Sequence, residues 1–133
     1  MKAPRIMLAA GRSGSGKTMI TCGLLRALQQ MGKQPAAFKC GPDYIDPMFH
    51  RTVLGIDTGN LDTFFADADA IGRILARDTK DAELIVMEGV MGYYDGVGGT
   101  TTMASSYELS KVTKTPVVLI VDAKGASVTL AAI

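Results

Sequence analysis

The sequence predicts an α/β fold, an open and mainly parallel β-sheet with helices on both faces. Short apolar runs of strand length alternate along the chain with segments whose apolar residues recur at helical spacing. The runs are continuous rather than alternating, which is typical of strands covered on both faces of a parallel sheet. With 133 residues, 47% of them hydrophobic and 20% charged, the chain is long and apolar enough to bury one core.

Four apolar runs are predicted to form the strands: 5–10, 35–40, 83–88 and 116–122. Helices are predicted in three places: from the end of the glycine-rich loop 11–16 to Gly32, over 67–78, and from Ser105 to Lys111. Segment 41–65 contains glycine and proline breakers and is predicted to be irregular. Residues 125–133 resemble the opening of a helix, so we expect the domain to be incomplete at its C-terminus.

Charge, apolar stretches and cysteine content bear on the partners and the location of the protein. Fourteen Lys and Arg residues against thirteen Asp and Glu residues leave a formal charge of +1. This balance gives no electrostatic reason to expect a nucleic-acid or membrane partner. No apolar stretch approaches the roughly 20 residues of a membrane span, and the apolar stretch near the N-terminus is too short for a signal peptide. Two cysteines are consistent with free thiols in the cytoplasm, where we expect the protein.

Residues 11–18 read GRSGSGKT and match the phosphate-binding pattern G-x-x-x-x-G-K-[ST] directly after a predicted strand and before a predicted helix. Glycines let successive backbone N–H groups turn toward a phosphate, and the helix N-terminus adds partial positive charge. The expected ATP-binding residues are Gly11, Ser13, Gly14, Ser15, Gly16, Lys17 and Thr18. Lys17 is expected to contact the β- and γ-phosphates and Thr18 to hold Mg²⁺. The motif predicts a nucleotide-binding fold of the P-loop NTPase type.

Acidic residues follow three of the other predicted strands. Glu88 ends strand 83–88, Asp122 ends the last strand, and Asp43 and Asp46 follow strand 35–40. Because the carboxyl ends of parallel strands face one crevice, these carboxylates can converge on the phosphate-binding loop. Turn formation or helix capping is the alternative for Asp43 and Asp46, since both lie beside prolines.

Six segments together resemble the cobyrinic acid a,c-diamide synthase family, and the resemblance covers essentially the whole chain. These segments are 5–10, 13–18, 38–47 (FKCGPDYIDP), 60–62, 88–96 (EGVMGYYDG) and 117–122. The phosphate-binding loop alone is common to many NTPases. The combination of K-x-G-P-D-Y-I-D-P with E-G-V-M-G-x-x-D-G is far more specific.

The resemblance implies an ATP-dependent amidoligase domain of the dethiobiotin-synthetase-like class, a ligase of cobalamin biosynthesis. Such domains phosphorylate the a and c side-chain carboxylates of cobyrinic or hydrogenobyrinic acid, and ammonia from glutamine then displaces the phosphate. The implied cofactors are ATP and Mg²⁺, with a metal set of Thr18, Asp46 and Glu88. The implied catalytic residues are Lys17, Lys39, Asp43 and Asp95, and the implied substrate contacts are Asp43 and Tyr44.

The chemistry of such a reaction calls for cations. A carboxylate that attacks the γ-phosphate is already ionised and needs no general base. The site must instead neutralise the charge between two anions, which requires lysines and a metal ion. Lys17 and Lys39, at the ends of neighbouring predicted strands, meet this requirement.

Full-length members of the family resemble a fusion of such a domain with a C-terminal glutaminase that carries a catalytic cysteine and histidine. No glutaminase is expected within this chain, because Cys22 lies on a predicted helix and Cys40 has no paired base. His50, the only histidine, is expected to make local contacts. A glutaminase domain or subunit is therefore an expected partner for amidation from glutamine. The ATP-binding domain could also form a homodimer.

Three other interpretations stay open. The first is another ligase of the same fold, a dethiobiotin synthetase or a cobyric acid synthase. The second is a dimeric ATPase switch of the ParA/MinD type, which carries a signature lysine five residues before the loop lysine. Arg12 occupies that position here, and arginine is not an equivalent donor. The third is an incomplete fragment that binds nucleotide weakly and catalyses nothing.

Overall fold

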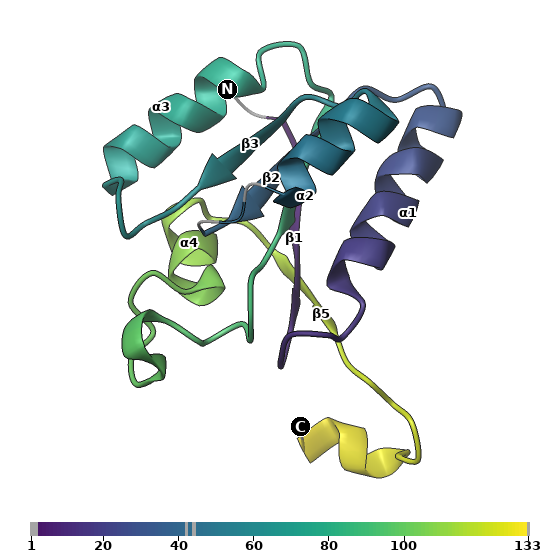
Figure 1. Ribbon diagram of the computed structural model, residues 1–133, viewed down its shortest axis with the longest axis vertical. Helices are drawn as coiled ribbons and strands as arrows, with labels where there is room; N and C mark the ends of the chain where they lie inside the picture. Colours follow the sequence, from purple (N-terminus) through teal and green to yellow (C-terminus); the bar gives the residue numbers. More distant parts are fainter. Residues whose placement is uncertain (1–2, 42, 44, 133) are drawn as a thin grey trace.

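The computed structural model describes residues 3–41, 43 and 45–132 and contains a five-stranded sheet with the order β3-β2-β4-β1-β5 (Figure 1). The strands are β1 (Arg5–Ala10), β2 (Pro35–Cys40), β3 (Thr58–Leu61), β4 (Leu84–Glu88) and β5 (Val117–Ile120). All four strand pairings are parallel. The predicted open parallel α/β sheet is confirmed.

Helices cover both faces of the sheet. They are α1 (Lys17–Gln30), α2 (Ile45–Phe49), the π-helix η1 (His50–Leu54), α3 (Ala68–Asp78), the 3₁₀ turn η2 (Val97–Gly99), α4 (Ser106–Val112) and the 3₁₀ helix η3 (Val128–Ala132). In Figure 1, α1 and α2 lie on one side of the sheet and α3 and α4 on the other, while η3 stands apart below it. None of the helices in the described residues is long and apolar enough to cross a lipid bilayer.

Successive residues of each central strand point to opposite faces, so the strands contribute to two separate cores. On the side of α3 and α4, the buried residues include Met7, Phe38, Ile85 and Met87 from the strands with Ile71, Leu75 and Leu109 from the helices. On the side of α1, they include Leu8, Ala37 and Val86 from the strands with Leu25 from the helix. Burial on both faces explains why the strand sequences read as continuous apolar runs.

The same alternation places two charged residues beside α1. Ala37 and Val86 face α1, so Lys39 and Glu88, two positions further along β2 and β4, face it as well. Lys39 and Glu88 are paired in the register between these neighbouring strands. Both lie at the carboxyl end of the sheet, where α1 begins.

Local signals set the helix boundaries as predicted. Gly32 has a φ of 76°, and the N–H groups of Gly32 and Lys33 donate to the last carbonyls of α1. The carboxylate of Asp67 caps α3 by accepting from the Ala70 N–H at 2.7 Å. The Ser105 hydroxyl caps α4 in the same way, from the Glu108 N–H at 3.2 Å.

Segment 41–65 differs from the prediction, because it contains α2, η1 and β3. Pro47 is the third residue of α2. A missing N–H does no harm there, because the N–H groups in the first turn of a helix have no acceptor within the helix. The short strand β3 has little β-propensity of its own and is held by its pairing with β2. At the other end of the chain, β5 stops at Ile120, and the expected final helix is the 3₁₀ helix η3.

Leu25 connects α1 to the sheet and is fully buried. Replacing Leu25 with alanine is expected to lower the free energy of unfolding by about 2–5 kcal/mol, because a cavity would remain where the side chain packs. Gln30→Ala, on the exposed side of the same helix, is the matched control and should change it by less than about 0.5 kcal/mol. Urea denaturation followed by circular dichroism measures both, and equal effects would contradict the packing described here.

Candidate functional site

The phosphate-binding loop leaves β1 and enters α1 with the backbone that the glycine pattern requires. Gly14 and Gly16 adopt φ values of 74° and 84°, a region that residues with a Cβ rarely occupy. The Ser15 hydroxyl donates to the Arg12 carbonyl at 2.9 Å and closes the turn from within. The loop therefore has the shape of an anion cradle at the N-terminus of α1.

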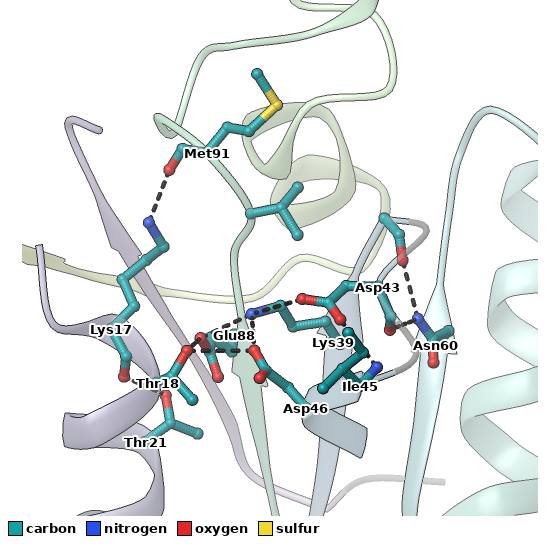
Figure 2. A network of polar contacts seen from close by, with 12 residues as sticks. Lys17, Thr18, Thr21, Lys39, Asp43, Ile45, Asp46, Asn60, Glu88 and Met91 are labelled. Carbon is teal, nitrogen blue, oxygen red and sulfur yellow. Dashed lines mark hydrogen bonds and ion pairs between the residues drawn. The ribbon is translucent and has the colours of Figure 1, made fainter. Parts of the chain in front are cut away.

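The Lys17 side chain bends back over its own loop. Its Nζ donates to the Met91 carbonyl at 2.8 Å (Figure 2). The same atom also donates to the Arg12 carbonyl at 3.1 Å. Lys17 is buried, and the loop after β4 lies directly against the phosphate-binding loop, since the Tyr93 N–H donates to the Ala10 carbonyl. Burial, and after it the charge of Lys39, lowers the pKa of Lys17.

Lys39, Asp46 and Glu88 form a compact ionic cluster at the carboxyl ends of β2 and β4 (Figure 2). The Lys39 Nζ lies 2.6 Å from Asp46 Oδ2 and 2.8 Å from Glu88 Oε1. Thr18 joins the cluster from α1, with its Oγ1 2.7 Å from Glu88 Oε1 and 3.2 Å from Asp46 Oδ2. Asp43 completes it, with Oδ2 3.6 Å from the same ammonium.

The ion pairs in this cluster outweigh the effect of burial on two of its members. Burial alone would lower the pKa of Lys39, yet the hydrogen bonds to Asp46 and Glu88 raise the pKa above its ordinary value. Burial alone would raise the pKa of Asp46, but the hydrogen bonds from Lys39 and Thr18 hold the pKa below its ordinary value. Both groups are therefore held in their charged forms.

The oxygen atoms of Thr18, Asp46 and Glu88 fit a magnesium ion. One hydroxyl proton faces two carboxylate oxygens, and the buried Glu88 Oε2 has no hydrogen-bond partner among the described residues. Three carboxylates against one ammonium leave a surplus of negative charge. The described residues hold no group of three or more His, Cys, Asp or Glu placed to bind a metal on their own. Mg²⁺ is usually held by one or two carboxylates together with substrate phosphates, which matches this set.

A cavity of about 510 Å³ connects the phosphate-binding loop with the ionic cluster. The sequence-predicted residues that line it are Ser13, Gly14, Gly16, Lys17, Thr18, Lys39, Asp43, Asp46 and Glu88. Of the other expected site residues, Gly11 and Ser15 belong to the loop but do not line the cavity. Tyr44, the expected substrate contact, lies outside the described residues.

Asp95 and Asp122 lie apart from the ionic cluster. Asp95 Oδ2 accepts from the Gly92 N–H at 2.8 Å and so closes the turn after β4. Asp122 forms an exposed ion pair with Arg12 at 3.6 Å, outside the lining of the cavity. Asp122 thus reaches the phosphate-binding loop, to which Arg12 belongs, but on the exposed side of that loop rather than inside the cavity.

Two residues contribute to the site without a predicted role. The Met91 carbonyl holds the Lys17 ammonium, and a backbone acceptor leaves no signal in the residue type. Asn60, at the end of β3, donates from Nδ2 to the Gly41 carbonyl at 2.9 Å and also to the Asp43 carbonyl. Asn60 thereby fixes the segment that carries Asp43, and an amide at a strand end is the signal that marks it.

Cys40 and His50, which lie near the ionic cluster, are buried. Burial raises the pKa of the Cys40 thiol to about 12, so this residue is an unreactive core thiol. His50 is also buried, and burial lowers its pKa against the opposing charges of Glu88 and Asp46. Its Nε2 has no hydrogen-bond partner among the described residues, so the expected local contact is not made through that atom.

A larger cavity, of about 640 Å³, lies at the other end of the strands, beside the amino ends of β2 and β3. Its walls carry both signs of charge, from Lys33, Arg51, Arg77 and Lys80 and from Asp57, Asp78 and Asp81. The phosphate-binding loop and the ionic cluster contribute none of its walls. The smaller cavity, which joins them, is therefore the candidate functional site.

The part of the chain that forms this site matches a known protein family. Residues 6–117 match the family described as the CobQ/CobB/MinD/ParA nucleotide binding domain. This match covers the phosphate-binding loop and all of the ionic cluster.

Curated relatives are similar over nearly the whole chain. A cobyrinate a,c-diamide synthase of Listeria monocytogenes serotype 4b (strain F2365) is 43% identical over 130 residues, which are 97% of this chain and 29% of the relative. One from Saccharolobus solfataricus is 45% identical over 129 residues, again 97% and 29%. A hydrogenobyrinate a,c-diamide synthase of Streptomyces coelicolor is 40% identical over 130 residues, 98% and 27%. The chain thus spans less than a third of the length of these relatives.

Proposed function

Because the chain belongs to the family of CobQ/CobB/MinD/ParA nucleotide-binding domains, we propose that it is the ATP-binding domain of an amidoligase that activates a tetrapyrrole carboxylate. The substrate would be cobyrinic or hydrogenobyrinic acid, as the names of the similar synthases suggest. The observation that carries the proposal is the ionic cluster of Lys39, Asp46 and Glu88, which contacts the Thr18 hydroxyl. Lys17 lines the same cavity as this cluster.

Each part of the cavity has a role in this reaction. Loop N–H groups and Lys17 bind the β- and γ-phosphates of ATP, and Thr18, Asp46 and Glu88 hold Mg²⁺. The metal ion, when bound, offsets charge on the phosphate oxygens. Lys39 and Lys17 lower the repulsion between the γ-phosphate and the attacking substrate carboxylate.

Phosphoryl transfer converts the carboxylate into an acyl phosphate and releases ADP. Ammonia then attacks the acyl carbon, and phosphate leaves. Asp43, which lines the cavity, would contact the substrate together with Tyr44, and Asp95 holds the turn of the loop after β4. Ammonia would come from a glutaminase domain or subunit, which is the partner that the proposal requires.

The proposal is tested by substrate-stimulated ATP turnover. The purified protein is supplied with ATP, Mg²⁺ and an ammonium salt in place of glutamine. Phosphate release is then measured with cobyrinic acid, hydrogenobyrinic acid or diaminononanoate. We expect stimulation by a tetrapyrrole acid and a mass spectrum that shows its amide.

Two results would contradict the proposal. Stimulation by diaminononanoate alone would indicate a dethiobiotin synthetase. Dimerisation that depends on ATP, without a response to any tetrapyrrole, would indicate a switch of the ParA/MinD type. Size-exclusion chromatography with and without ATP separates the second result from the proposal.

A further inference from the structure

The Lys39 ammonium is hydrogen-bonded to both carboxylates of the proposed metal set. Asp46 Oδ2 and Glu88 Oε1 each accept from Lys39, at 2.6 and 2.8 Å, and each also faces the Thr18 hydroxyl (Figure 2). A carboxylate oxygen offers two lone pairs. Each oxygen thus accepts from Lys39 and also lies within hydrogen-bonding distance of the Thr18 hydroxyl, whose single proton can serve only one of them.

A divalent ion bound to the same two carboxylates would be a close neighbour of the ammonium. Charges of the same sign at that separation repel strongly, and burial reduces the screening by water. The Lys39 side chain is 5% exposed and that of Glu88 is 1% exposed, so little water reaches the contact. The two cations therefore compete for one pair of carboxylates, those of Asp46 and Glu88.

Asp43 offers the ammonium a second position. Its Oδ2 lies 3.6 Å from Lys39 Nζ, and its side chain is 34% exposed, the largest exposure among the carboxylates that Lys39 contacts. Two contacts fix Asp43 in place: Oδ1 accepts from the Ile45 N–H at 3.0 Å, and its backbone carbonyl accepts from Asn60. A short movement of Lys39 toward the cavity mouth would complete this pair.

We propose that Lys39 is an exchangeable cation that occupies the two metal carboxylates and moves onto Asp43 when a divalent ion binds. This inference rests on the proposed function, since it concerns the same metal site. The exchange links metal binding to the position of a lysine. The ammonium leaves Asp46 and Glu88 for the cavity, where the γ-phosphate and the substrate carboxylate would meet. In that position Lys39 would orient the two reacting groups as well as offset their negative charge.

Metal binding without nucleotide tests the exchange. In Lys39→Met the competing cation is gone while the volume of the side chain is kept. Mn²⁺ affinity, measured from the free-Mn²⁺ electron paramagnetic resonance signal, is expected to rise by on the order of tenfold or more. Lys33→Met, which removes a lysine paired with Glu83 far from the cavity, should leave the affinity unchanged.

Stability provides a second readout, because Lys39→Met removes the cation that is paired with Asp46 and Glu88. The variant is expected to melt at a lower temperature than the wild type in EDTA and to gain more from Mg²⁺. A variant that folds only with Mg²⁺, by circular dichroism, would support the exchange equally. Mn²⁺ affinity that is unchanged or lower, or a variant that Mg²⁺ does not restore, would overturn it.

Asp43→Asn tests the second position of Lys39, since asparagine can still accept the Ile45 N–H. We expect Asp43→Asn to weaken Mn²⁺ binding in the wild type and to have a smaller effect in the Lys39→Met background. Equal effects in both backgrounds would overturn the movement onto Asp43. Binding of Mg·ATP to the wild type is measured in parallel. If it is absent, the proposed function fails, whereas unchanged Mn²⁺ affinity in Lys39→Met alone removes only the exchange.

Discussion

Replacement of Lys17 with alanine is expected to lower kcat/KM for ATP by about a thousandfold. Lys17 is the one lysine of the loop, and its ammonium lies over the cradle formed by residues 11–16. Lys39 cannot take its place, because the carboxylates that pair with it, those of Asp43, Asp46 and Glu88, all lie outside the phosphate-binding loop. Binding of a fluorescent ATP analogue and phosphate release measure the loss.

The Lys17 result has to be separated from a loss of structure. Lys17 Nζ also ties the phosphate-binding loop to the Met91 carbonyl, so alanine removes a contact between two loops. Lys17→Arg keeps a cation that can reach a backbone carbonyl but changes the geometry at the phosphates. Comparable melting temperatures for Lys17→Ala, Lys17→Arg and the wild type would assign the loss to the site. Nucleotide affinity that Lys17→Ala retains would contradict the proposed role of this residue.

Those parts of the fold that depend on residues close together in the sequence could be predicted from the sequence. Strands β1, β2 and β4 are continuous apolar runs, and the caps Asp67 and Ser105 act within one turn of their own helices. The meeting of Lys39 with Glu88 was predictable for a related reason. Both side chains end parallel strands, and parallel strands bring their carboxyl ends to one edge of the sheet.

The segment between β2 and α3 was not predictable in this way, because its structure depends on distant partners. The strand β3 has the sequence TGNL, with one large apolar residue, and becomes a strand only through its pairing with β2. Pro47 indicates a break by residue type alone, yet it fits the first turn of α2. The Lys17 contact with Met91 uses a backbone carbonyl, which any residue would supply.

Replacement of Glu88 with glutamine is expected to lower Mg²⁺-dependent ATP turnover by about a hundredfold to a thousandfold. Glutamine keeps the size of the side chain and one oxygen, so the fold of β4 is retained. It removes the negative charge that faces both Lys39 and Thr18 at 2.8 and 2.7 Å. The metal set would then keep a single carboxylate, that of Asp46, and the Mg²⁺ concentration for half-maximal turnover should rise.

A matched control shows whether this effect belongs to the site. Glu83 is the other glutamate of this strand region, and it accepts from Lys33 and the Gln34 N–H at the opposite edge of the sheet. Glu83→Gln loses an exposed pair whose contribution to stability is small. It should leave the Mg²⁺ dependence unchanged. If Glu88→Gln kept the wild-type Mg²⁺ dependence as well, the buried Glu88 carboxylate would be a structural partner of Lys39, and the metal would have to bind elsewhere.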